Sequence, residues 1–180
     1  MTALKKQVDV KDALRLMPVR PVYLVSVANE GKKSIISIGM YAMFSSKPCL
    51  VGVGVARSRF SFDLIRLSKE FVVNAVDERL MKAVNMCGEN SGRDMDKFAL
   101  CGLSAVKGVN VNAPLIGDSP VSLECRVVQE VEFGDHVWFI GEVVAAHARE
   151  GFDWKNGLLF KWIGEDGFFF KPDSDSVGQY

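Results

Sequence analysis

Two long strand-like segments in the second half of the chain constrain its fold more than any other feature. VSLECRVVQEVEF (121–133) and HVWFIGEVVAAHA (136–148) are rich in β-branched and aromatic residues, and only Gly134 and Asp135 separate them. Strands joined by so short a connection pair as an antiparallel hairpin. We therefore expect a long hairpin here, which any fold of this chain must accommodate.

The first half of the chain predicts several shorter strands and then helices. The loop NEGK at 29–32 has the composition of a hairpin turn, so the strands on either side should be antiparallel neighbours. After the third strand the apolar spacing becomes helical, with Ser58 suited to the N-cap. The expected strands are 21–29, 33–40, 49–56 and 70–76, the expected helices follow Ser58 and span 78–88 up to a glycine, and 91–115 should hold one short helix, one short strand and loop.

The C-terminal part predicts one more hairpin. GLLFKWIGEDGFFFKP (157–172) reads as two short strands turned at GEDG, and the polar residues 173–180 read as a loose tail. We see no internal repeat and no linker between domains. We therefore expect one domain over residues 1–180, with its core at about 15–148.

Antiparallel hairpins dominate this pattern. The only passage that resembles a strand–helix–strand unit is 49–76, so a doubly wound parallel sheet is disfavoured. The expected fold is mainly β with flanking helices: a closed or partly closed antiparallel β-barrel.

Charge and hydropathy exclude several classes of function. The 22 basic and 22 acidic residues cancel, which removes the positive field of a general nucleic-acid binder. No run of about 18 apolar residues occurs, so no membrane helix is expected. The first 21 residues carry charges throughout and lack the apolar stretch of a signal peptide. We expect a cytoplasmic protein that binds neither nucleic acid nor membrane.

The cysteines do not indicate a metal site. Cys49, Cys87, Cys101 and Cys125 form no CxxC pair, and the chain has only two histidines. We expect reduced, partly buried thiols and no bound metal.

The glycines of GVGVAR (52–57) resemble the start of a dinucleotide-binding fingerprint. The third glycine is missing, and no acidic residue stands about 20 positions further on at a strand end. The glycines more plausibly thin the strand so that another group can approach it closely.

A candidate anion site follows that strand. ARSRFS places Arg57, Ser58, Arg59 and Ser61 at the expected start of a helix, where free backbone N–H groups and the helix dipole favour an anion. A phosphate would fit there. In the alternative interpretation Ser58 is only an N-cap and the arginines are solvated.

His136 stands at the mouth of the strand 136–148. A histidine in this place serves either the turn, by a structural hydrogen bond, or a site, by contacting a ligand. The pattern alone leaves both roles open.

Several segments of the chain, taken in their order along the sequence, resemble the flavin reductase-like FMN-binding split barrels, which include the flavoredoxins. The resemblance runs from about Arg20 to Glu142. It rests on RPVYLVSV, SIISIGMYAMFSSKP, VGVARSRFSFDLI, EFVVNAV, SGRDMDKF, APLI and LECRVVQEVEFGDHVWFIGEVV.

The resemblance implies a set of site residues. The flavin ring should lie along the segment matching Ser37 to Ser46, and the pieces matching Arg59, Ser61 and Lys97 should approach the flavin phosphate. The implied cofactor-binding residues are Ser37, Ile38, Gly39, Met43, Phe44, Ser45, Ser46, Arg59, Phe60, Ser61, Asn74 and Lys97. The GDH segment at 134–136 implies that His136 is a catalytic residue that positions nicotinamide or substrate.

Three positions depart from the family pattern. Met40 and Met43 stand where many relatives carry an aromatic residue and a proline, and methionine is softer around a ring. Lys47 stands where an acidic residue is frequent; it is either an exposed loop residue or an attractor for an anionic second substrate.

The function implied by the resemblance is redox chemistry on FMN. The first hypothesis is an NAD(P)H-dependent flavin reductase that passes hydride to flavin. The second is a flavoredoxin-type electron carrier with tightly bound FMN, and the third is a non-catalytic FMN-binding module. The resemblance also implies a homodimer with FMN at its interface and a small-molecule or protein electron acceptor.

Overall fold

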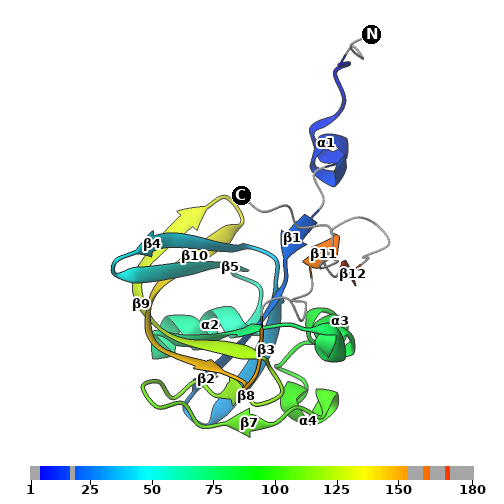
Figure 1. The fold of residues 1–180 in the computed structure, drawn as a ribbon. Coiled ribbons are helices and arrows are strands. Elements are labelled where there is room, and N and C mark those ends of the chain that lie inside the picture. Colours follow the sequence, from blue (N-terminus) through cyan, green and yellow to red (C-terminus); the bar gives the residue numbers. More distant parts are fainter. Residues whose placement is uncertain (1–4, 17–18, 154–159, 163–168, 171–180) are drawn as a thin grey trace.

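A computed structural model describes residues 5–16, 19–153, 160–162 and 169–170 of the chain (Figure 1). Its helices are α1 (Val10–Leu16), α2 (Phe60–Ser68), the short 3-10 turn η1 (Glu78–Leu80), α3 (Met81–Glu89) and α4 (Lys97–Cys101). Its strands are β1 (Val19–Pro21), β2 (Tyr23–Asn29), β3 (Lys32–Ile38), β4 (Tyr41–Ser46), β5 (Cys49–Ala56), β6 (Glu70–Ala75), β7 (Ala105–Val106), β8 (Leu115–Ile116), β9 (Val121–Phe133), β10 (His136–Ala148), β11 (Phe160–Trp162) and β12 (Phe169–Phe170).

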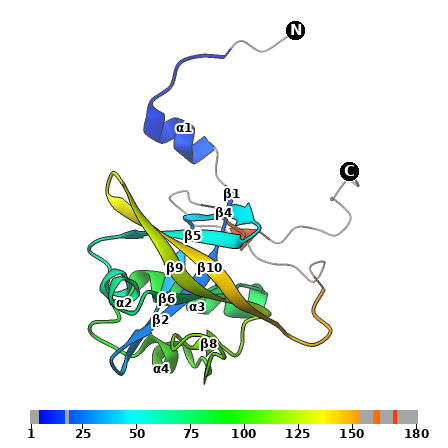
Figure 2. The same cartoon turned by 90° about the vertical axis from the view of Figure 1, so that its left-hand side faces the viewer.

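Seven strands form one antiparallel sheet in the order β3-β2-β6-β9-β10-β5-β4. This confirms the expected fold class, mainly β and antiparallel with flanking helices. The two outermost strands, β3 and β4, are consecutive in the chain and only Gly39 and Met40 join them. The sheet curls so that β3 also contacts β5, and α2 lies at one end of the curl (Figures 1 and 2). The result is a barrel with one open seam.

The long hairpin expected from the sequence is confirmed. Strands β9 and β10 pair antiparallel with Phe133 opposite His136, and only residues 134 and 135 connect them. Gly134 has a φ of 59°, a conformation that favours glycine. The hairpin of β2 and β3 is confirmed as well, and its loop residues Glu30 and Gly31 both have positive φ.

The barrel interior is packed with apolar side chains from the sheet and from α2. Val53, Phe71 and Phe139 are fully buried there, and Ile65 of α2 packs among them. A second apolar cluster lies under α3 and α4, where Leu24 and Phe98 are buried. These two clusters fix the position of α2 relative to α3 and α4.

The glycines of β5 do thin the strand, as the sequence predicts. A Cβ on Gly52 would lie 2.4 Å from Phe44 Cε2 and 3.2 Å from Trp138 Cε3. A Cβ on Gly54 would lie 3.0 Å from Met40 Cβ and 3.2 Å from the Trp138 indole. Because Gly52 and Gly54 have no side chains, Phe44, Met40 and Trp138 can pack closely against the backbone of β5.

Among the elements that differ from the sequence prediction are a strand and the end of a helix. β4 was not expected, because YAMFSS mixes polar, aromatic and sulfur side chains without clean alternation, and the strand lies at the edge of the sheet. The helix expected to stop at Gly88 runs to Glu89, where Asn90 follows as the C-cap residue.

Smaller sheets complete the described part of the chain. β1, β11 and β12 form a three-stranded sheet in which β11 pairs with β12 antiparallel, and β7 pairs with β8. The turn expected at GEDG and the tail at 173–180 lie outside the described residues. No helix in the described segments is long and apolar enough to cross a membrane.

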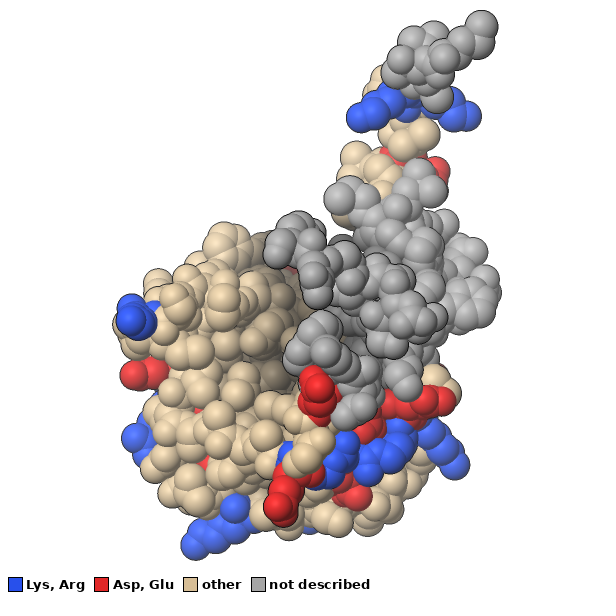
Figure 3. All heavy atoms as spheres, in the orientation of Figure 1, with Lys and Arg blue, Asp and Glu red and all other residues tan. Residues whose placement is uncertain are grey.

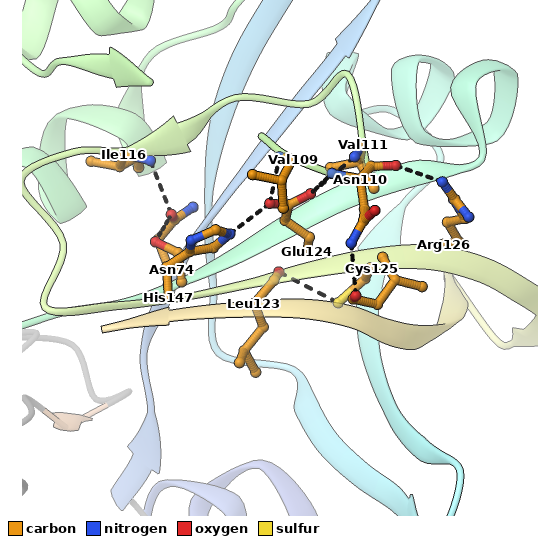
Figure 4. A network of polar contacts seen from close by, with 12 residues as sticks. Asn74, Val109, Asn110, Val111, Ile116, Leu123, Glu124, Cys125, Arg126 and His147 are labelled. Carbon is orange, nitrogen blue, oxygen red and sulfur yellow. Dashed lines mark hydrogen bonds and ion pairs between the residues drawn. The ribbon is translucent and has the colours of Figure 1, made fainter. Parts of the chain in front are cut away.

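A buried carboxylate organises the loop before β8 (Figure 4). Glu124 of β9 is 0% exposed and accepts hydrogen bonds from the backbone N–H groups of residues 109, 110 and 111 at 2.7–2.9 Å. Its Oε1 also lies 2.6 Å from His147 Nε2. Burial raises the pKa of Glu124, but these donors outweigh burial and hold its pKa below the usual value. The Glu124 carboxylate therefore holds the loop residues 109–111 against the sheet.

Candidate functional site

The first turn of α2 offers free backbone donors. The helix begins at Phe60, so Arg59 occupies the N-cap position and no side chain caps the turn. The expectation that Ser58 caps this helix is wrong, because the helix begins one residue further along than that cap requires. Uncapped N–H groups and the positive end of the helix dipole favour an anion here.

The two arginines before this turn have different environments. Arg57 forms an ion pair with Glu132 and packs over the Phe62 ring, so its charge is already used. Arg59 is exposed and makes no ion pair with a described residue. Of the pair, only Arg59 lines the adjacent pocket.

The pocket beside this turn has a volume of about 400 Å³. Its walls are the end of β3, the first residues of α2 and the two residues before them, the end of α3 with the residues that follow it (87–93), and the first residue of α4. Ser37, Arg59, Phe60, Ser61 and Lys97 all line it, so the structure brings together five residues that lie up to 60 positions apart.

Lys97 is the most informative of these residues. It is 4% exposed, and its Nζ donates to the backbone carbonyl oxygen of Cys87 at 2.6 Å. No described carboxylate lies within ion-pair distance of it. Burial lowers the pKa of Lys97, because a buried ammonium loses its hydration. A buried cation without a counter-ion, at the wall of a pocket, indicates a place for a negative ligand.

α4 is capped, unlike α2. Asp96 accepts hydrogen bonds from the backbone N–H groups of Phe98 at 2.9 Å and Ala99 at 3.4 Å, which fixes the first turn and therefore the starting point of the Lys97 side chain. Lys33 and these two N–H groups help to lower the pKa of Asp96 despite its partial desolvation.

Arg93 is a pocket residue that the sequence analysis missed. Its guanidinium donates to the Ser58 carbonyl oxygen at 3.0 Å and to Asp63 Oδ2 at 3.3 Å, and it lies 5.7 Å from the Phe60 ring centroid. Its segment, SGRDMDKF, carries part of the family resemblance, and a basic residue four positions before Lys97 was the available signal. Arg93 adds a third cation around the start of α2.

A second hollow, of about 460 Å³, lies on the other side of the end of β3. Gly39, Met40 and Tyr41 line it together with the aromatic rings of Phe133 and Trp138. Ser37 lines the first pocket and Gly39 the second, so the two hollows adjoin along the connection from β3 to β4.

His136 lines this second hollow. Its Nδ1 lies 2.7 Å from Asp135 Oδ1, and its side chain is 23% exposed. Hydrogen bonding to His136, and its charge, lower the pKa of Asp135. No described residue bonds Nε2 of this histidine, so one ring nitrogen is fixed by the turn and the other is available. His136 lies opposite Ala56 of β5, and Arg59 follows Ala56 by three positions in the chain.

The remaining candidate residues lie elsewhere. Ile38 is 4% exposed and belongs to the barrel core. Met43 and Phe44 are 68% and 50% exposed on β4, and Ser45 and Ser46 follow them on the same strand. Lys47 is exposed in the loop after β4.

Asn74 does not reach either hollow. It is 0% exposed, and its amide nitrogen donates to Leu24 O and Ser26 Oγ, while its Oδ1 accepts from Ile116 N at 3.0 Å and Ser122 Oγ at 2.7 Å (Figure 4). Both ends of the amide are therefore used to join β2, β6, β8 and β9. This side chain has a structural place, because no part of it is left to meet a ligand.

Known proteins resemble this chain in sequence and in fold. The family model described as flavin reductase like domain matches residues 15–162. An uncharacterized protein of Archaeoglobus fulgidus is 35% identical over 85% of this chain and 86% of its own length. An NADH-dependent FMN reductase of Streptomyces nodosus is 26% identical over 79% and 75%. The crystal structure of a flavoredoxin from Methanosarcina acetivorans superposes with a TM-score of 0.80 at 27% identity, covering 100% of this chain and 92% of that one.

Proposed function

This chain belongs to the flavin reductase-like domain family, and on that premise we propose that it is a cytoplasmic oxidoreductase that binds FMN and reduces it with NAD(P)H. The flavin phosphate would occupy the pocket beside α2, and the nicotinamide would approach from the hollow that His136 lines. FMN, when bound, supplies the hydride-accepting ring, and the protein supplies binding and orientation.

The buried ammonium of Lys97 is the observation that carries the proposal. It lies at the wall of a pocket that Arg59 and the uncapped first turn of α2 also line, and Arg59 forms no ion pair with a described residue. Three positive groups at the wall of one pocket fit a phosphate dianion, and each would form a charge-assisted hydrogen bond with it. A neutral ligand would leave the Lys97 charge uncompensated.

The ring of the flavin would lie along the connection from β3 to β4. Just before this connection, Ser37 of β3 lines the phosphate pocket, and Gly39 of the connection lines the second hollow. Ser37 itself donates its hydroxyl to Val84 O at 2.5 Å, so it holds α3 against β3 and offers the ligand mainly backbone. His136 would orient the second substrate with its available Nε2.

A homodimer would complete the site. β4 is an edge strand that pairs only with β5 among the described strands, and Met43 and Phe44 are exposed on it. Figure 3 shows mostly uncharged residues over β4 and β5, whereas charged residues gather at the lower right. An apolar edge of this kind favours burial against a second copy of the chain. The exposed candidate residues of β4 would then line the flavin from the dimer interface.

A flavoredoxin-type electron carrier is the second candidate. The likeness to the Methanosarcina acetivorans flavoredoxin, which spans the whole chain, favours it. Such a carrier would keep its FMN bound and pass electrons to a protein acceptor, so the same phosphate pocket would serve both functions.

One titration and one reduction distinguish these functions. FMN is added to purified protein, and quenching of its fluorescence measures binding; no binding at micromolar FMN removes both proposals. NADH or NADPH is then added without oxygen. Bleaching of excess free FMN by catalytic protein identifies a reductase. Bound FMN that stays oxidised with both nicotinamides, yet is bleached by dithionite, identifies the carrier.

A further inference from the structure

Two cysteines face each other behind the phosphate pocket. Cys87 lies on α3 and Cys101 ends α4, and their Sγ atoms are 3.6 Å apart. Both thiols are free. Cys87 is 1% exposed and also lines the pocket, whereas Cys101 is partly exposed. Neither thiol has a part in the proposed flavin chemistry.

We propose that Cys87 and Cys101 form a redox-sensitive dithiol, which a hydroperoxide converts to a disulfide that weakens the hold of Lys97 on a phosphate ligand. A disulfide needs an Sγ–Sγ distance of about 2.05 Å, so the two sulfur atoms must approach by roughly 1.5 Å. A rotation of the partly exposed Cys101 side chain together with a small shift of α4 would supply that approach, because α4 is only a short helix.

The chemistry needs one two-electron oxidant, a hydroperoxide. Cys101, the more exposed thiol, attacks the peroxide oxygen and becomes a sulfenic acid, and the peroxide leaves as an alcohol or water. The sulfur of Cys87 then attacks the Cys101 sulfur, the S–S bond forms, and the hydroxyl departs as water with the Cys87 proton. Burial, together with Cys101, raises the pKa of Cys87 to about 12, so the buried Cys87 thiol does not react first with the peroxide. Its attack on the sulfenic acid goes through the small thiolate fraction, and the short Sγ–Sγ distance favours that step. A dithiol reductant reverses the reaction.

The link to the pocket runs through α4 and rests on the proposed function. Lys97 and Cys101 are four residues apart on this helix, so they lie on the same face. The Lys97 ammonium already bonds the carbonyl oxygen of Cys87, the residue that Cys101 would bind covalently. Formation of the disulfide would draw α4 toward α3. The Lys97 ammonium would then lie between the two helices and further from the phosphate ligand.

The first experiment tests the disulfide without any flavin. Because Cys49 is exposed and able to cross-link molecules, the Cys49→Ser variant is used. It is treated with hydrogen peroxide, and peptide mapping by mass spectrometry should show the loss of two hydrogens across a Cys87–Cys101 pair, reversed by dithiothreitol. The matched Cys49→Ser/Cys101→Ser variant should show no such pair. Thiols that stay reduced, or a bond that involves Cys125 instead, would overturn the proposal.

The second experiment measures ligand affinity in both redox states of the Cys49→Ser variant. Oxidation should weaken the affinity for FMN roughly 3- to 10-fold. This is less than the effect of losing a whole charge-assisted hydrogen bond, which costs about tenfold or more. Riboflavin, which lacks the phosphate, should bind equally to both states. A disulfide that forms without changing FMN affinity refutes the link to Lys97. Absence of FMN binding to the reduced protein refutes the proposed function, and the first experiment still decides the disulfide.

Discussion

The ammonium nitrogen of Lys97 lies 2.6 Å from the backbone carbonyl oxygen of Cys87, and this is its one hydrogen bond among the described residues. An ammonium has three donors, so two remain for a ligand. A carbonyl orients the group without neutralising it, which keeps a full positive charge at the pocket wall.

Replacement of Lys97 by methionine should weaken FMN binding and leave riboflavin binding nearly unchanged. A charge-assisted hydrogen bond contributes about 1.5–3 kcal/mol, so the loss for FMN should be roughly 10- to 150-fold. Fluorescence titration of both flavins measures it. Equal losses for FMN and riboflavin would mean that the variant has a damaged pocket, which circular dichroism would reveal.

FMN affinity should fall as the pH rises through the pKa of Lys97 in the flavin-free protein. Burial lowers that pKa, and a phosphate dianion binds the protonated ammonium. Below this pKa the charge is present and FMN binds fully; above it the charge is lost. Titrations of FMN across alkaline pH, with riboflavin as the pH-insensitive control, measure the effect. A parallel decline for both flavins would point to another group.

Arg59→Ala should weaken FMN roughly 10- to 150-fold, because its guanidinium would meet the phosphate at the start of α2. Arg66→Ala supplies a matched control in the last turn of the same helix, where the arginine faces Glu130 at 3.9 Å instead of the pocket. The control should bind FMN like the unmodified protein. If both variants lose affinity equally, general electrostatics and no specific phosphate contact explains the result.

His136→Ala should leave FMN affinity nearly intact and slow the reduction of FMN by NAD(P)H. The histidine lines the second hollow and not the phosphate pocket, so its loss affects the geometry of the second substrate. Anaerobic stopped-flow bleaching measures the rate. Collapse of FMN affinity with normal reduction of the remaining bound flavin would make His136 a structural residue of the β9–β10 turn.

Glu124→Gln should destabilise the protein by about 1.5–3 kcal/mol at neutral pH, because the buried anion accepts several hydrogen bonds. The folded-state pKa of Glu124 is depressed, so this stability is present above the unfolded-state pKa and is lost as the pH falls through the folded-state pKa. Urea unfolding should therefore show the two proteins converging in acid. Glu130→Gln, on the same strand but in a partly exposed ion pair with Lys69, should cost only about 0.2–1 kcal/mol.

The sequence predicted the elements whose information is local. The hairpin of β9 and β10 followed from residue type and a two-residue connection, and the glycines of β5 from the need for close packing. β4 was missed because an edge strand lacks the alternation that burial of one face imposes.

Site residues that belong to a local motif could be predicted from the sequence, and residues that only tertiary structure brings to the site could not. Arg59 and Lys97 were expected at the phosphate and do line one pocket. Arg93 was missed, since its role depends on a contact with Ser58 at a distance of 35 residues in the chain. Asn74 was expected near the flavin, yet its hydrogen bonds join four strands, and no local pattern distinguishes such an asparagine from a ligand-binding one.

The connection of β3 to β4 spans the open seam of the barrel with only Gly39 and Met40. A circular permutant opened between these two residues would keep every strand pairing of the seven-stranded sheet. It would lose only the covalent connection between the two edge strands, β3 and β4. The spacing between the two hollows would then no longer be fixed.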